Sequence, residues 1–102
     1  FLYSFLEDTR LPLSILRLPG RTYEFTIIAF EEFSGKKRKE LKGMAEEELY
    51  TTEQTALLDE KTDEAVNSNA PVFINTCGLK AWQSVLLDNM NIPEYLIRIF
   101  IK

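Results

Sequence analysis

Apolar and polar positions alternate most clearly at the carboxyl-terminal end of the chain. The two alternating sets are Tyr95, Ile97, Ile99 and Ile101 against Leu96, Arg98, Phe100 and Lys102. A period of two residues is typical of a β-strand, because successive side chains of a strand point to opposite faces of the sheet. The pattern therefore predicts a strand over residues 95–102.

Two further segments favour strands. Thr22–Phe30 is rich in aromatic and β-branched residues, and its later half is apolar on both sides, which predicts a central strand. Pro71 precedes a second, short strand at Val72–Ile74. The first twenty residues fit either strand alternation or a short helix capped by Asp8 or Thr9, and we favour a strand there.

Helix-forming residues dominate positions 36–65 and predict two helices. The break lies at Thr51, which with Gln54 three residues later matches a capping box. A third helix is predicted from Thr76 to Met90, where apolar residues including Trp82 recur at helical spacing, so we assign Trp82 to the core. Pro93 follows the end of this helix.

These elements together define the expected fold. A strand, a helix and a strand over residues 72–101 are long enough for a right-handed parallel crossover. We predict an α+β fold, a two-layer sandwich in which helices pack on one face of a small mixed sheet. Residues 1–102 are expected to form a single domain. The chain begins at Phe1 without methionine, and the alternative that it is a fragment of a longer chain stays open.

Composition narrows the chemistry. The chain has a net charge of −4, which argues against general attraction to nucleic acid or to anionic lipid. It contains no histidine and therefore lacks the commonest general base and the usual neutral zinc ligand. The single cysteine, Cys77, cannot form an internal disulfide, and this favours an intracellular, cytoplasmic location. We predict no enzyme, no metal site, no cofactor and no membrane span.

The sharpest local feature is a run of cations. The basic segment consists of Lys36, Lys37, Arg38, Lys39 and Lys42. Such a cluster can bind nucleic acid or an acidic partner, and it resembles a short nuclear-import signal, so the nucleus is an alternative compartment. The simpler interpretation is a solvated loop whose cations pair with nearby glutamates.

Two other groups of reactive side chains have simple structural explanations. Residues 46–64 hold eight acids and one lysine. Asp59 with Asp63, and Glu60 with Glu64, are four residues apart and could share a divalent cation, but this spacing matches no calcium-binding loop. Cys77 lies at the start of the predicted third helix, where a thiol pKa is lowered, but no histidine can activate it. We interpret the acids as a solvated helix surface and Cys77 as a small buried side chain.

The last strand suggests a different mode of action. If Ile97, Ile99 and Ile101 belong to an unpaired sheet edge, a partner strand can add to them. The leading hypothesis is a non-enzymatic protein-interaction or regulatory domain that acts through this edge or through its charge-polarised helices. The partner is another protein or a second copy of the chain. A nucleic-acid-binding module that uses residues 36–42 is the alternative. An enzyme that uses Cys77 or the carboxylates of residues 46–64 ranks third.

Overall fold

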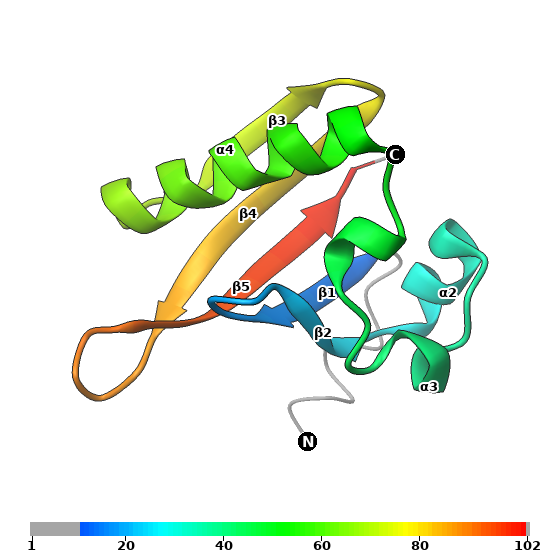
Figure 1. Cartoon of the computed structure of the whole chain (residues 1–102), viewed down its shortest axis with the longest axis horizontal. Coiled ribbons are helices and arrows are strands. Elements are labelled where there is room, and N and C mark those ends of the chain that lie inside the picture. The colour runs from blue at the N-terminus through cyan, green and yellow to red at the C-terminus, as the bar shows by residue number, and fades with distance from the viewer. Residues whose placement is uncertain (1–10, 102) are drawn as a thin grey trace.

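The computed structural model describes residues 11–101, in which five strands form one sheet. The strands lie in the spatial order β2-β1-β5-β4-β3, and every neighbouring pair is antiparallel. Their bounds are β1 Leu13–Arg17, β2 Thr22–Thr26, β3 Val72–Thr76, β4 Leu79–Leu87 and β5 Pro93–Phe100. The strand β5 is therefore the centre of the sheet, and β2 and β3 are its edges (Figure 1).

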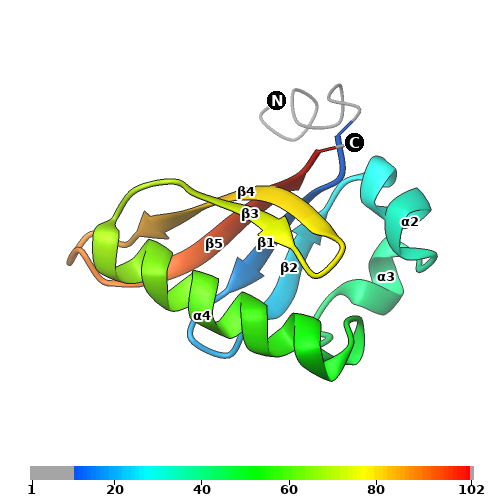
Figure 2. The same cartoon turned by 90° about the horizontal axis from the view of Figure 1, so that it is seen from above.

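The helices lie on one face of this sheet (Figure 2). They are α2 Ile28–Ser34, α3 Arg38–Leu41, the 3-10 helix η1 Glu46–Glu48 and α4 Thr52–Ser68. The long helix α4 covers β3 and β4, whereas α2 and α3 lie near the opposite end of the molecule (Figure 1). The predicted α+β fold with helices on one face is confirmed.

The core fills the space between the helices and the inner face of the sheet. Leu16, Leu58, Ile74 and Leu96 are fully buried there, and each such side chain contributes about 1.5–3 kcal/mol on burial. An aromatic group closes the end beneath α2: Phe30 lies 5.6 Å from Tyr23, ring centre to ring centre. These contacts hold the helical layer on one side and leave the other side of the sheet uncovered by any described helix.

Local signals predicted several elements correctly. Helix α4 begins after the capping box: the Gln54 backbone N–H donates to Thr51 Oγ1 at 3.1 Å, and the Thr51 N–H donates to Gln54 Oε1 at 3.2 Å. The final strand and its alternation are confirmed by β5. The strand interpretation of the first twenty residues is confirmed at Leu13–Arg17 by β1, while residues 1–10, with the caps proposed at Asp8 or Thr9, lie outside the described residues.

The predicted helix from Thr76 to Met90 is wrong, because residues 79–87 form β4. Cys77 and Gly78 both have positive φ, 55° and 78°, and make the two-residue turn of a hairpin between β3 and β4. The polar Gln83 points into the core and interrupts the apolar alternation of the strand. Since the β3, β4 and β5 strands form an antiparallel meander, the parallel crossover and the mixed sheet are wrong too.

The prediction for Thr22–Phe30 was right only in its first half. The strand β2 ends at Thr26, and α2 begins at Ile28, with buried Phe30 facing the core. This strand pairs with β1 alone among the named strands, so it is an edge strand rather than a central one. Apolar residues on both sides of the segment reflect the change from strand to helix at Ile27, not burial of both faces of one strand.

Candidate interaction surface

The face of the sheet opposite the helices carries exposed apolar side chains. We call it the open face. Leu13, opposite Ile99 on this face, is only 4% exposed. Ser84 and the following half-buried or exposed apolar residues are its other members: Ile15, Phe25, Phe73, Trp82, Leu86, Tyr95, Ile97 and Ile99. Trp82 is 47% exposed, Leu86 46% and Phe73 37%. Large apolar side chains exposed side by side are unusual on a water-facing sheet and mark interaction surfaces.

Strand register places these side chains in rows. Phe73 is opposite Trp82, and Trp82 is opposite Ile99, so one row crosses β3, β4 and β5. The rings of Phe73 and Trp82 lie 4.9 Å apart, centre to centre. A second row runs from Ser84 through Ile97 to Ile15. The apolar positions of three or more strands therefore form one continuous surface.

A small hollow lies in this surface beside Trp82. Its volume is about 80 Å³, and Pro71, Ser84, Ile97 and Ile99 complete most of its lining. The lining is almost wholly apolar, so the hollow suits an aliphatic side chain of a partner. A tryptophan next to an apolar hollow is the arrangement that contributes most to binding in protein interfaces.

One end of the open face is polar. Arg17 donates to the Tyr95 hydroxyl at 3.1 Å, and its guanidinium carbon lies 5.3 Å from the centre of the Tyr95 ring. A weak ion pair of 4.0 Å joins Arg17 to Glu24. Because these side chains are exposed, they form a polar rim rather than a buried charge cluster.

The sheet edge predicted at Ile97, Ile99 and Ile101 does not exist. Strand β5 pairs with β1 on one side and β4 on the other, and the Ile101 N–H donates to the carbonyl of Lys80 at 2.8 Å. Ile97 and Ile99 lie on the open face instead. Trp82 was assigned to the core of a helix and is exposed on a strand, so the sequence analysis missed the residue that dominates this surface.

The inner face carries a buried polar row beneath the helices. Pairing places Thr26, Ser14, Arg98 and Gln83 side by side across β2, β1, β5 and β4. All four are at most 3% exposed. Arg98 Nε donates to Gln83 Oε1 at 3.1 Å, and the Arg98 guanidinium forms an ion pair with Glu46 of η1. Arg98 is thus a central core residue and not an edge cation.

Two tyrosines lie near this row. Burial raises the pKa of the Tyr23 hydroxyl far above its ordinary value, and the neighbouring Tyr50 raises it further. Burial also raises the pKa of Tyr50, while the positive charge of Arg98 opposes that rise. Both phenols therefore stay protonated at neutral pH.

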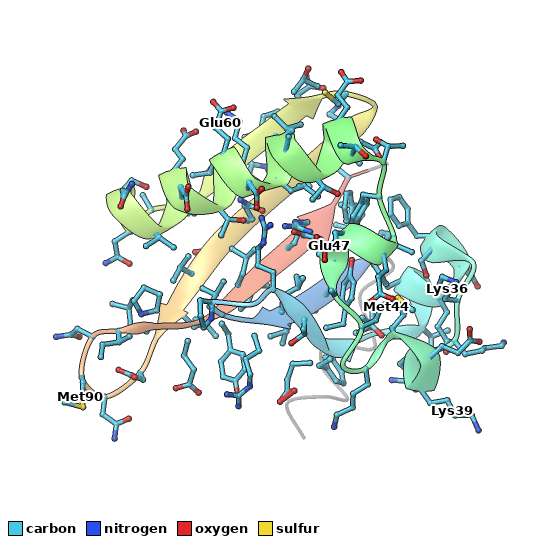
Figure 3. All side chains as sticks on the ribbon, in the orientation of Figure 1. Lys36, Lys39, Met44, Glu47, Glu60 and Met90 are labelled. Atoms are coloured by element: carbon cyan, nitrogen blue, oxygen red, sulfur yellow. The ribbon has the colours of Figure 1, made fainter. Side chains whose placement is uncertain are left out.

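The basic segment lies in and around α3, on different elements from those that form the hollow beside Trp82. Lys37, Lys39 and Lys42 are exposed, and Lys36 is half-buried. Figure 3 shows Lys36 and Lys39 at the α2–α3 end of the molecule. The Arg38 backbone N–H donates to Glu31 Oε2 at 2.7 Å, and its side chain lies 3.5 Å from the Thr26 carbonyl. The structure brings the lysines together but ties Arg38 to its neighbours.

The acidic stretch is divided between two environments. Glu46 is buried in the ion pair with Arg98, whereas Glu53, Glu60, Asp63 and Glu64 are exposed on α4. Lys61 lies 3.2 Å from Glu64 Oε2. Within residues 11–101, no three acidic or cysteine side chains converge in a way that could hold a metal ion.

Cys77 occupies a hairpin turn. Its thiol lies 3.5 Å from Glu53 Oε1, and its carbonyl accepts a hydrogen bond from Gln54 Nε2 at 3.0 Å. The helix expected to follow Cys77 is β4, so the helix N-terminus invoked for its reactivity is absent at that position. In the described part of the chain, no helix is long and apolar enough to cross a membrane.

Comparison with known proteins finds similar folds only among solved structures. No protein-family model and no curated protein matches the sequence. Among solved structures, a sensory box sensor histidine kinase from Vibrio cholerae has a TM-score of 0.75 at 16% identity over 98% of this chain and 84% of its own. A LOV protein from Rhodobacter sphaeroides has a TM-score of 0.71 at 11% identity, covering 99% of this chain and 67% of that one.

A third neighbour is described as an RNA-binding Light-Oxygen-Voltage receptor. Its TM-score is 0.69 at 13% identity, and the match covers 99% of this chain but only 32% of the receptor. This chain therefore spans about a third of that protein. At these identities the likeness shows the fold alone: a five-stranded antiparallel sheet with helices on one face.

Proposed function

We propose that this chain is a non-enzymatic regulatory domain that acts by protein association through the open face of its sheet, with a second copy of the chain as the partner. The observation that carries the proposal is the exposed row of Phe73, Trp82 and Ile99 beside an apolar hollow. The sensory-domain fold supports a regulatory role.

The size of the open face fits a dimer. Three strands of five residues, one of eight and one of nine, about 4.8 Å apart and rising about 3.4 Å per residue, define a face on the order of 500 Å² before side-chain relief is counted. A standard interface buries about 800 Å² on each partner. The centre of the face carries no acidic residue, so the net negative charge of the chain is kept away from the contact.

Measuring mass in solution tests this proposal. Light scattering over a concentration series should show a species of twice the 11.8 kDa monomer mass. Trp82→Ala should raise the dissociation constant at least tenfold, which corresponds to about 1.4 kcal/mol. Ile28→Ala is the matched control, because Ile28 is 52% exposed but lies on α2, away from the open face. A monomer at every concentration, or equal effects of both variants, would overturn it.

A second candidate function is nucleic-acid binding through the basic segment. The exposed lysines around α3 favour it, and one structural neighbour is described as RNA-binding. Replacing Lys36, Lys37, Lys39 and Lys42 by serine should abolish binding of a mixed oligonucleotide and remove its steep dependence on salt. Replacing Lys61 and Lys80 by serine is the control. Binding that survives the first set of substitutions contradicts this function.

The cytoplasm is the compartment we propose for this domain, with the nucleus as the alternative that the basic segment would serve. Fluorescence microscopy of a tagged chain distinguishes them. Nuclear accumulation that disappears when Lys36, Lys37 and Lys39 become serine would support the alternative.

A further inference from the structure

A chain of ion pairs runs from the surface of α4 to the centre of the sheet. Asp59 on α4 pairs with Arg21, Arg21 lies 3.4 Å from Glu46, and Glu46 pairs with Arg98 on β5. The side chains are 59%, 16%, 1% and 0% exposed in that order. Four residues from four different parts of the fold thus connect solvent to the interior.

The middle of the chain is held by backbone contacts as well as by charge. The Glu46 backbone N–H donates to the Arg21 carbonyl at 3.0 Å, and Thr22 forms an isolated β-bridge with Ala45. The helix η1 is followed within a few residues by Thr51, the cap of α4. A short segment therefore joins Glu46 to the amino-terminal end of α4, and Glu46 contacts both arginines.

The inner end of the chain is connected to the open face. Arg98 lies between Ile97 and Ile99 on β5, and both isoleucines point to the open face because strand side chains alternate. Strand β5 pairs with β1 and β4, which supply most of the other open-face residues. Arg98 therefore joins the inner face to the open face through the backbone that it shares with Ile97 and Ile99.

The stability of the fold does not by itself require a buried ion pair between Arg98 and Glu46. Apolar residues of similar volume often replace a buried ion pair without loss, because desolvation of the charges cancels much of their attraction. Yet Arg98 and Glu46 occupy the centre of the core, in a polar row with Gln83 and Ser14. We propose that the ion-pair chain Asp59–Arg21–Glu46–Arg98 transmits changes at the surface of α4 to the open face of the sheet.

This regulation rests on the proposed function of the open face, but its test does not. Trp82 is the only tryptophan of the chain and lies on the open face, so its indole N–H signal in NMR reports that surface directly. Asp59→Asn should shift this signal, although Asp59 lies on the opposite side of the sheet. Glu60→Gln is the matched control: Glu60 is the adjacent acid on α4 and is exposed, and Figure 3 shows it on the upper side of that helix.

The decisive comparison repeats Asp59→Asn in two other backgrounds. Arg21→Met breaks the chain of ion pairs at a half-buried position and leaves the buried pair intact. Glu46→Leu with Arg98→Met replaces the buried pair by apolar residues. The Trp82 shift should vanish in both backgrounds. Should the double variant not fold, the Arg21→Met background decides alone.

An equal Trp82 shift with and without an intact chain of ion pairs would overturn the inference, as would a native-background shift no larger than that of Glu60→Gln. If the chain dimerises, Asp59→Asn should also change the dissociation constant about fivefold, the lower end of typical coupling between two sites. If light scattering shows only monomers, the proposed partner is wrong, and the Trp82 signal still tests the transmission.

Discussion

Each face of the sheet carries one group of residues that its surroundings do not favour. The inner face, covered by helices, carries the charged Arg98 in its central row, whereas the open face exposes Trp82, Leu86 and Phe73. The buried arginine is tolerated because Glu46 and Gln83 supply its partners. Trp82 and Phe73, by contrast, remain largely exposed to water within the described residues. This difference is the basis of our proposal that the open face serves association, whereas the inner face holds the helices on the sheet.

The largest expected effect comes from breaking the inner polar row. Arg98→Ala leaves Glu46 buried without its main partner and should lower the free energy of unfolding by about 3–5 kcal/mol. Urea denaturation followed by circular dichroism measures this change. Lys80→Ala, at an exposed position of β4, is the control and should change stability by no more than about 0.5 kcal/mol. A loss below 1 kcal/mol for Arg98→Ala would contradict the importance of the buried pair.

Neighbouring residues of β5 sharpen the comparison of faces. Leu96 is fully buried on the inner face and Ile97 is half-buried on the open face. Leu96→Ala should cost about 2–5 kcal/mol, because it removes core contacts and leaves a cavity. Ile97→Ala should cost about half as much in the monomer but should weaken association. Urea denaturation at low protein concentration and light scattering separate the two effects, and equal losses of stability would contradict the assignment.

Alkaline pH probes the inner face without mutation. The pKa of Tyr23 is higher in the folded chain than its unfolded value of about 10, so the folded state binds the proton more tightly. The stabilisation is fully present below pH 10 and is lost as the pH rises above that value, by about 1.4 kcal/mol per pH unit for each such tyrosine. Thermal denaturation at increasing pH measures the loss, and Tyr23→Phe should reduce it. Full stability of the native chain well above pH 10 would contradict the buried phenol.

Elements encoded by neighbouring residues could be predicted from the sequence. The Thr51–Gln54 capping box requires only contacts across three residues, and the start of α4 follows from it. The alternation of residues 95–102 likewise predicted β5, since all its inner and outer positions are visible in the sequence.

Elements that depend on distant partners could not be predicted. Gln83 at an inward position hides the strand pattern of β4, and only its contact with Arg98 explains why a polar residue is buried there. The pairing of β5 with both neighbours is also a property of the whole sheet, so the supposed edge at Ile97 and Ile99 turned out to be the centre. The sequence therefore identified Ile97 and Ile99 as surface residues, but it did not predict that they lie on the face of a central strand beside the exposed Trp82.

Concentration-dependent NMR tests the role of the open face most directly. On dilution of the native chain, the signals that shift most should belong to the open face, above all Trp82, Ile97 and Ile99, while those of residues 36–42 stay constant. Shifts that gather instead on α4 or on the basic segment, with the Trp82 signal unchanged, would contradict the account.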